Sequence, residues 1–352
     1  MIVTPTAVDL FAGAGGATQG LRDAGFDVRV AVENDETAAR TWSLNHPGVV
    51  ICDDILQVTA TAILSAARLK KGELTLLKAC PPCQGFSTLR GKNSPDEARN
   101  DLVLDTLRLV SQLEPAAVLL ENVPGLRRDA RFETLVSGMR DLGYSVSDYL
   151  VDAQALGVPQ RRRRLVVLAI RDGEAAPPGL NELIPEATRR PLMTAGKALS
   201  ALDAEALTTD VVHVWRSSRG NTATRLAAIP VGGTRFDLPE ALQLDCHKRL
   251  DERSGGSSRN AGGSYGRVRL GDPAPTMTTR CTTPACGSFV HPVENRGLSL
   301  REAAAFQTFP QNYKWAGNYG EIEKQIGNAV PVWMAEAFGL AALRSLKLTQ
   351  SV

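Results

Sequence analysis

The sequence is poor in cysteine and aromatic residues, has little net charge, and lacks any long apolar run. Its 352 residues include 6 cysteines and 5% aromatics, and 40 basic against 38 acidic side chains give a formal charge of +2. So few cysteines exclude a disulfide scaffold and favour a reducing cytoplasm. The charge balance excludes a histone-like polycation. The longest aliphatic run is 165–170, whereas a membrane-spanning helix needs about 20 apolar residues.

The composition that remains is typical of a globular protein, and we expect no membrane segment and no signal peptide. Hydrophobic residues make up 43% of the chain and charged residues 22%, which argues against disorder. The first basic residue is Arg22, so the positively charged start of a signal peptide is missing. The length predicts one large domain and one smaller one.

The first 170 residues alternate between strand-like and helix-like segments. Helical stretches lie between most of the strand candidates, which are 7–11, 28–32, 49–51, 74–79, 116–120, 144–151 and 165–170. This alternation predicts an α/β fold whose mainly parallel sheet carries helices on both faces.

The pattern changes after residue 172. Segment 172–191 carries four prolines and is predicted to be a linker, and 213–295 is rich in Gly, Ser, Thr and Arg. That second segment has eleven basic and seven acidic residues, which fits equally a solvated loop-rich lobe and a surface that contacts phosphates. Ser299 and Glu302 have the spacing of a capping box that opens a helix. Pro331 is expected in the first turn of a last helix.

A glycine-rich turn follows the first predicted strand. Gly13, Gly15 and Gly16 lie between that strand and a helix, and Glu33 ends the second strand 20 residues after Gly13. Glycines let the backbone approach a ligand, and an acid at this distance reaches ribose hydroxyls in dinucleotide-binding folds. Thr18 stands where a third glycine would complete that pattern. The turn therefore favours an adenosine-containing cofactor, either a nicotinamide nucleotide or S-adenosylmethionine.

Two cysteines follow the fourth predicted strand. Cys80 and Cys83 have the spacing of a redox pair or half a zinc site, but no second such pair or close histidine pair exists, so we expect no metal. A buried structural cysteine is a second interpretation. The third is that Cys83, between Pro82 and a polar loop, is a nucleophile.

A carboxylate and a run of arginines follow two further strands. Glu121 comes after the strand predicted at 116–120, where a carboxyl group tends to have a raised pKa and can hydrogen-bond a base. Gln160, Arg162 and Arg164 are expected on one face of a strand by their period of two. A structural acid and a solvated basic cluster remain the alternative interpretations.

Taken together, these segments resemble the DNA (cytosine-5)-methyltransferases. The resemblance covers nearly the whole chain and comes in the family's order. The matching segments are Asp9-Leu10-Phe11-Ala12-Gly13-x-Gly15-Gly16, Pro82-Cys83-Gln84-x-Phe86-Ser87, Glu121-Asn122-Val123, Gln160-x-Arg162-x-Arg164, Arg296-x-Leu298-Ser299-x-Arg301-Glu302-x-x-x-x-Gln307 and Gln325-Ile326-Gly327-Asn328-Ala329-Val330-Pro331. The sequence departs from the family pattern at Asn34, which replaces a frequent aromatic residue, and at Ser299, which replaces a threonine. Cys80 has no counterpart that explains it, and we interpret it as structural.

The resemblance implies a reaction and a role for each catalytic residue. Cys83 would add as a thiolate to carbon 6 of cytosine, and Glu121 would hold ring nitrogen 3. Arg164 would help to hold the cytosine oxygen, with support from Arg162. The methyl group of S-adenosylmethionine would then move to carbon 5, which needs the cysteine because that carbon is otherwise a poor nucleophile.

The resemblance also implies the fold and the binding residues. It predicts a Rossmann-like S-adenosylmethionine-dependent fold in 1–172, a small loop-rich target-recognition domain in 173–294, and a segment 295–352 that returns to the catalytic domain. The implied cofactor-binding residues are Phe11, Gly13, Gly15, Gly16, Glu33, Asp54, Ile55, Pro82, Leu102 and Asn328. The implied DNA-binding residues are Ser87, Arg99, Gln160, Arg216, Arg219, Arg225 and Arg235. The target cytosine would be flipped out of the duplex.

The expected partner is double-stranded DNA, and the protein is expected to be a cytoplasmic monomer. A cognate restriction endonuclease or other defence-system proteins are further candidate partners. An RNA-methylating relative is an alternative, although the Cys-Phe-Thr tripeptide of that branch is absent. A non-catalytic relative would have lost Cys83, Glu121 or Arg164. A nicotinamide dehydrogenase would leave these three residues unexplained.

Overall fold

The computed structural model describes residues 4–82, 101–173, 177–245, 248 and 263–348. The chain forms two compact units. Unit 1 contains residues 1–157, 163–191 and 329–352, and unit 2 contains residues 158–162 and 192–328. Each unit is described by itself.

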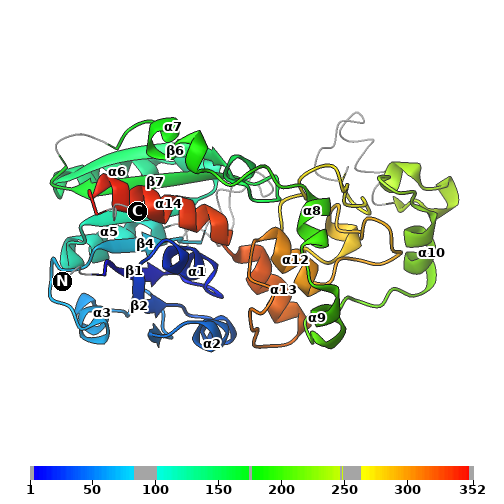
Figure 1. Ribbon diagram of the computed structural model, residues 1–352, viewed down its shortest axis with the longest axis horizontal. Coiled ribbons are helices and arrows are strands. Elements are labelled where there is room, and N and C mark those ends of the chain that lie inside the picture. The colour runs from blue at the N-terminus through cyan, green and yellow to red at the C-terminus, as the bar shows by residue number, and fades with distance from the viewer. Residues whose placement is uncertain (1–3, 83–100, 174–176, 246–247, 249–262, 349–352) are drawn as a thin grey trace. The chain divides into compact units, whose positions relative to one another are not determined.

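Unit 1 is built on a seven-stranded sheet (Figure 1). Its strands are β1 (Thr6–Leu10), β2 (Asp27–Val32), β3 (Val49–Ile51), β4 (Leu76–Ala79), β5 (Ala117–Asn122), β6 (Tyr144–Asp152) and β7 (Arg163–Arg171). They lie in the order β3-β2-β1-β4-β5-β7-β6. Strands β1 to β5 pair in parallel, whereas β7 is antiparallel to both of its neighbours. The predicted mixed sheet is confirmed.

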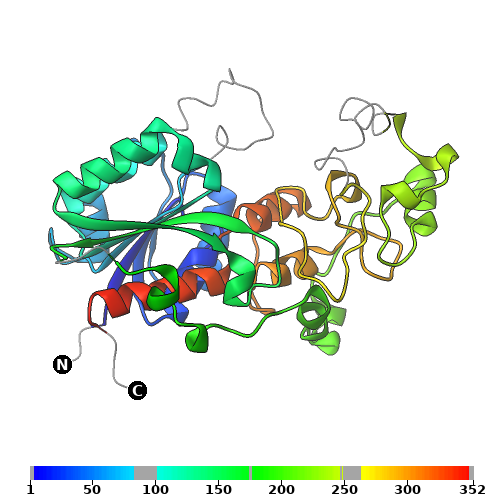
Figure 2. The same cartoon turned by 90° about the horizontal axis from the view of Figure 1, so that it is seen from above.

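Helices cover both faces of this sheet (Figure 2). Helices α5 and α6 pack on one face, and α1 and α14 pack together on the other. The longer helices of unit 1 are α1 (Gly16–Asp23), α2 (Glu36–Asn45), α3 (Ala60–Ala67), α5 (Leu102–Leu113), α6 (Ala130–Asp141) and α14 (Val332–Ser345). Short ones are α7 (Leu180–Leu183), η1 (Pro124–Arg128), η2 (Ala153–Leu156) and η3 (Glu186–Thr188).

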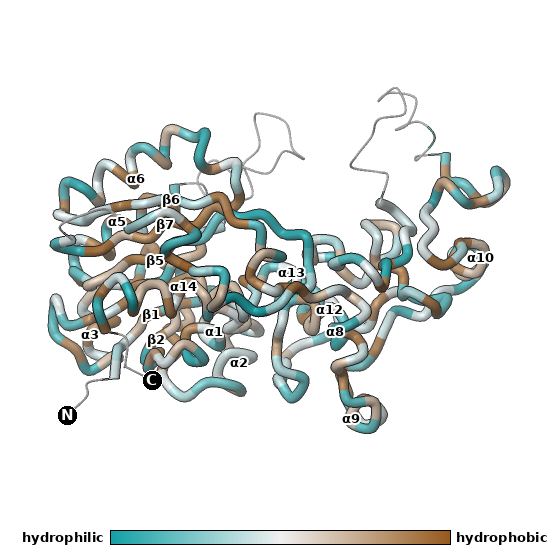
Figure 3. The backbone as a smooth tube through the Cα atoms, turned by 45° about the horizontal axis from the view of Figure 1, so that its top comes forward, coloured by the Kyte–Doolittle hydropathy of each residue, from teal (hydrophilic) through white to brown (hydrophobic). Residues whose placement is uncertain are grey.

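The alternation of side chains along the central strands decides what each face contains. Val8, Leu77 and Leu120 join the apolar core beneath α5 and α6, and the central strands form an apolar band in the hydropathy view (Figure 3). Their neighbours in sequence point to the opposite face, because successive side chains of a strand alternate. That opposite face, under α14, therefore receives both apolar side chains and the charged side chains described below.

Close packing of α1 on α14 depends on glycine. A Cβ atom added at Gly20 would lie 2.2 Å from the carbonyl oxygen of Val332. Only glycine lets the two helix backbones approach so closely. This contact joins the start of the chain to its last helix.

Two element boundaries differ from the sequence prediction. Strand β5 includes Glu121 and Asn122, because β7 pairs with both of them, whereas the prediction ended the strand at residue 120. Pro331 is the N-cap of α14 instead of a residue of its first turn. The predicted capping box of Ser299 and Glu302 is confirmed at the start of α12 (Leu300–Phe306).

Unit 2 has little regular structure. Its helices are α8 (Ala195–Ser200), α9 (Ala204–Thr209), α10 (Gly220–Ala228), α12 and α13 (Tyr319–Asn328), with the turns η4 (Arg235–Asp237), η5 (Glu240–Leu242) and η6 (Pro284–Cys286). Its described residues form isolated bridges but no named strand. One small apolar cluster contains Leu226, Ile229, Leu238, Tyr265 and Val290.

The units do not follow the predicted domain boundaries at the C-terminal end. Residues 295–328, which the prediction placed in a segment returning to the catalytic domain, lie in unit 2, and unit 1 resumes at Ala329. The functions assigned to the domains stay predictions. The stretch Tyr319–Ser345 is apolar enough to cross a membrane (mean hydropathy 1.3), but 72% of that window is buried inside the protein. It comprises the separate helices α13 and α14.

Candidate active site

The glycine turn after β1 has the strained backbone that its glycines allow. Gly13 and Gly15 have φ angles of 55° and 91°, and Gly15 is the N-cap of α1. Phe11 also has a positive φ, 56°, which is uncommon for a residue with a side chain. The turn therefore presents backbone N–H groups and the N-terminus of α1 at the carboxyl end of β1.

Glu33 braces this turn from the end of β2. The Gly13 N–H donates to Oε2 at 2.8 Å, and the Asp35 N–H donates to Oε1 at 2.9 Å. Burial raises the pKa of the Glu33 carboxyl above its usual value, although these backbone N–H groups act in the opposite direction. Each carboxylate oxygen can accept more than one hydrogen bond. Glu33 can thus hold the turn and still bind ribose hydroxyls.

The other predicted cofactor residues of unit 1 gather near the same edge. Asp54 is exposed after β3 and accepts a bond from the Leu56 N–H at 3.0 Å, while Ile55 is buried. Pro82 follows β4, and Leu102 is the first residue of α5. The carboxyl ends of parallel strands are where open α/β sheets bind nucleotides, so these residues fit an adenosine-containing cofactor. Asn328 is exposed at the end of α13 in unit 2.

Glu121 is held at the end of β5 by two side chains. Arg164 on β7 places its Nε 2.8 Å from Oε1, and the Cys80 thiol donates to Oε2 at 2.9 Å. Glu121 is only 6% exposed. The Asn122 amide donates to the carbonyl oxygen of Pro81 at 3.2 Å. The segment that leads to Cys83 is therefore attached to the end of β5.

A buried ion pair lies beside this group. Lys78 Nζ is 2.8 Å from Asp9 Oδ1, and the two side chains are 3% and 0% exposed. Thr18 donates to Asp9 Oδ2 at 2.6 Å and accepts from the Trp42 indole at 2.8 Å. Burial alone would lower the pKa of Lys78, but Asp9, Cys80 and Glu121 outweigh it and raise that pKa. Sequence reasoning missed Lys78, whose only signal is a lysine within an apolar strand.

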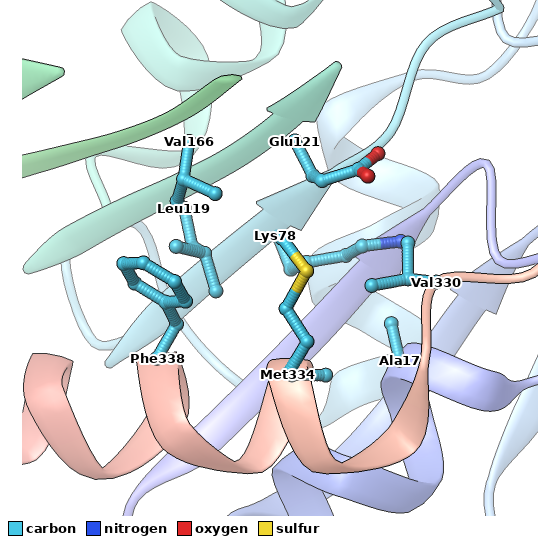
Figure 4. Close-up of a pocket in the computed structure, with 9 residues that line it drawn as sticks. Ala17, Lys78, Leu119, Glu121, Val166, Val330, Met334 and Phe338 are labelled. Carbon is cyan, nitrogen blue, oxygen red and sulfur yellow. The ribbon is translucent and has the colours of Figure 1, made fainter. Parts of the chain in front are cut away.

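Figure 4 shows Lys78 and Glu121 on neighbouring strands, extending from the face of the sheet that α14 covers. A cavity of about 20 Å³ opens between this face and α14, which is enough for one water molecule. Its lining residues are Ala17, Lys78, Leu119, Glu121, Val166, Val330, Met334, Ala335 and Phe338. The cavity is too small for a cofactor, so any cofactor binds at the open edge of the strands.

Comparison with known proteins identifies the family. The family model of C-5 cytosine-specific DNA methylases matches residues 6–343. The chain belongs to this family. Its relative M.HgiDII, a Type II methylase of Herpetosiphon aurantiacus, is 33% identical over 97% of this chain and 94% of the relative. M.PspPI, a Type II methyltransferase of a Psychrobacter strain, is also 33% identical, over 96% of this chain and 79% of its own length.

A solved structure shares the fold of this C-5 cytosine-specific DNA methylase. The Dnmt2 methyltransferase of S. pombe has a TM-score of 0.67 and 16% identity, with 97% of this chain and 99% of that chain covered. The methylase is therefore a DNA (cytosine-5)-methyltransferase by family, and its methyl donor is S-adenosylmethionine.

Several residues predicted for the methylase's site lie elsewhere or outside the description. Cys83, Ser87 and Arg99 lie outside the described residues. Arg162 is buried in unit 2, where it donates to the Met277 carbonyl oxygen at 3.3 Å. Gln160 is also buried in unit 2, and its amide binds the Phe306 carbonyl and the Met277 N–H.

The expected common face of Gln160, Arg162 and Arg164 is not formed by a strand, because β7 begins at Arg163. The period-two argument therefore applies to Arg164 alone. Arg164 is the member that the structure brings to Glu121.

Three of the four arginines predicted to bind DNA have partners within unit 2 of the methylase. Arg216 pairs with Glu323 at 3.1 Å and stacks on Tyr319, and Arg225 donates to the Leu242 carbonyl at 2.6 Å. Arg235 is buried and stacks on Phe236. Arg219 is exposed. Among the described residues, no group of three or more side chains is arranged to hold a metal ion.

Proposed function

We propose that this enzyme methylates carbon 5 of a flipped-out cytosine within a specific duplex DNA sequence, through a covalent bond between Cys83 Sγ and carbon 6. The observation that carries the proposal is the Glu121 carboxylate, held by Arg164 and Cys80 at the edge of the sheet where the chain leads to Cys83. A buried carboxyl group with an arginine beside it suits recognition of a polar heteroaromatic ring.

The proposed reaction begins at Cys83. Its thiolate adds to carbon 6, and the electron pair of the carbon 5–carbon 6 double bond makes carbon 5 nucleophilic. Bound S-adenosylmethionine supplies an electrophilic methyl group. Carbon 5 takes this methyl group, a base then removes the proton from carbon 5, the double bond forms again and the thiolate leaves.

Glu121 and Arg164 act on the ring during this addition. The carboxyl group of Glu121 hydrogen-bonds ring nitrogen 3 and so stabilises the charge that develops when the thiolate adds. Arg164 binds one Glu121 oxygen and, with Arg162 in support, holds the cytosine oxygen. Because each group is fixed by its own partners, little reorganisation is needed when the base arrives.

The cofactor role of the glycine turn is supported by its geometry. Gly13 and Gly15 keep the turn open to a ligand, and Glu33 offers acceptors for the ribose hydroxyls. Phe11 packs on the adenine and Asp54 binds its edge. Asn328 completes this site in the proposal.

We assign target recognition to the loop-rich part of unit 2, where the arginine excess suits phosphate and guanine contacts. A base inside a duplex is out of reach of Cys83, which is why the cytosine must be flipped out. Because the relatives are Type II methyltransferases, we further propose a restriction-modification setting in the cytoplasm. A partner endonuclease would then cleave the same sequence when it is unmethylated.

Duplex DNA in which 5-fluorocytosine replaces cytosine tests the covalent step. Fluorine at carbon 5 cannot leave as a proton, so the enzyme should stay attached to the DNA after methyl transfer. We expect a complex that survives denaturing electrophoresis with the wild-type protein and with the control Cys286→Ser, whose thiol is exposed in unit 2. Cys83→Ser should form none. A complex that persists in Cys83→Ser would overturn the role of Cys83.

A further inference from the structure

The ion pair of Asp9 and Lys78 is buried in the middle of an otherwise apolar sheet. The two residues face each other on the paired strands β1 and β4, and both are almost fully shielded from water. Burying two charges costs several kcal/mol per ion, and apolar side chains of similar volume often stabilise a fold at least as well. Stability alone therefore does not explain this pair.

The pair connects two parts of the active site. On one side, Asp9 binds Thr18, which lies in α1 directly after the glycine turn. On the other side, Lys78 neighbours Glu121 across β4 and β5, and both line the cavity under α14. The two side chains extend from the same face of the sheet (Figure 4).

We propose that Lys78 is a positioning residue, which holds a positive charge beside the Glu121 carboxylate and ties it through Asp9 to the glycine turn. This inference rests on the proposed role of Glu121. Lys78 does not touch the substrate in this arrangement. It fixes the direction and charge of Glu121 before the base arrives.

The other groups around Glu121 leave a distinct place for Lys78. Arg164 approaches from β7 and Cys80 from the end of β4. Helices α14 and α1 contribute only apolar side chains to this cavity, among them Met334 and Ala17. Lys78 is thus the one cation among the described cavity-lining residues.

A double variant separates positioning from structural support. Lys78→Met and Asp9→Asn each leave one buried charge without its partner, so each alone should lower the melting temperature strongly. The double variant removes both charges and should recover most of that loss, because the amide oxygen introduced by Asp9→Asn can still accept the bond from Thr18. Lys71→Met is the matched control, since Lys71 forms an exposed ion pair with Glu114.

We expect the double variant to bind S-adenosylmethionine within about threefold of wild type by calorimetry, while kcat falls about tenfold, as expected for the loss of a charge a few ångströms from the reacting group. The side of the pH–rate profile that Glu121 controls should move to higher pH by about one unit, because a nearby cation favours an ionised carboxylate. Lys71→Met should leave all three quantities unchanged.

Two results would overturn the proposal. A double variant with wild-type kcat and pH profile would show that the pair only supports the fold. Weaker cofactor binding with unchanged kcat would limit the pair to the glycine turn. A wild-type protein that binds cofactor but methylates no DNA would overturn the proposed function itself, and the role of Lys78 with it.

Discussion

The two units of this enzyme bury charged side chains in different ways. Unit 1 is an apolar sheet whose buried charges, Asp9, Lys78 and Glu121, lie at or near the carboxyl ends of the strands. Unit 2 has a small apolar core and relies on buried arginines that bind backbone carbonyls and carboxylates. Buried charge therefore marks the candidate site in unit 1 but serves the fold in unit 2.

Arg267 is the clearest case in unit 2. It is 5% exposed and donates to the carbonyl oxygens of Leu226, Ile229, His291 and Glu294 and to Asn295 Oδ1. These partners come from separate loops. A single guanidinium thus replaces the ladder hydrogen bonds that a sheet would supply.

A second arginine anchors the start of α12. Arg296 binds both oxygens of Glu302, at 2.9 and 2.7 Å. Burial acts to raise the pKa of Glu302, but Arg296 and the Ser299 N–H outweigh it and keep that pKa below its usual value. The comparison teaches that arginine content in a loop-rich region overstates the charge available to DNA.

The largest effect that sharpens this comparison is expected at Arg267. Arg267→Ala leaves five acceptors in the interior of unit 2 without their donor. We expect the free energy of unfolding to fall by about 3 to 5 kcal/mol, as for the loss of other buried networks. Urea unfolding measures this change.

The matched control for this prediction is Arg269→Ala. Arg269 lies two residues away, is exposed and makes one hydrogen bond, to the Gly232 carbonyl at 3.3 Å. Its removal should cost less than about 0.5 kcal/mol. Similar losses in both variants would contradict the view that buried arginines hold unit 2 together.

In unit 1 the comparable polar group is His46, which is buried beside Trp42 below the glycine turn. Burial, with the charge of Arg22 adding to it, lowers the pKa of His46 from 6.5 to about 4. The unfolded chain then binds the extra proton below pH 6.5, so stability should be lost as the pH falls from 6.5 towards 4. A shift of this size corresponds to about 3 kcal/mol.

Urea unfolding at several pH values measures this loss in the wild type and in His46→Gln. The variant should lose most of the pH dependence between 6.5 and 4, because glutamine does not titrate. Equal slopes in the two proteins would assign the dependence to other groups and remove His46 from the account of unit 1.

The smallest expected effect concerns DNA binding by unit 2. Arg219→Ala should reduce the slope of log K against log salt by about 0.9, the contribution of one phosphate contact. Arg216→Ala and Arg225→Ala should change the slope less, because both guanidinium groups are engaged within the unit. Titration of mixed-sequence duplex DNA at several salt concentrations gives the slopes. Equal reductions in all three variants would restore the simpler view that every arginine faces DNA.

The sequence predicted unit 1 better than unit 2 for a physical reason. Strands such as 49–51 and the helix after Ser299 depend on local patterns of burial and capping, and the structure has both. The Asp9–Lys78 pair depends on which strands become neighbours, which no local pattern reveals. The bonds of Arg267 reach across 41 residues to Leu226, and the sequence carries no signal for a carbonyl acceptor.

The candidate site was likewise predictable in part. The glycine turn, Glu33 and Glu121 follow from their place after strands. The contact between Cys80 and Glu121 does not, because Cys80 has no counterpart in the family motifs and its partner lies on another strand. The end of β5 was misplaced since its last two residues are held in the strand by β7, far along the chain.

Methyl transfer from labelled S-adenosylmethionine, offered duplex DNA of mixed sequence and tRNA in parallel, tests the central claim most directly. Base-resolved mapping of the products then locates 5-methylcytosine. The account predicts label in the duplex only, at one cytosine of a short repeated sequence, and its loss in Cys83→Ser. Label confined to tRNA, or a Cys83→Ser protein that methylates the duplex normally, would contradict it.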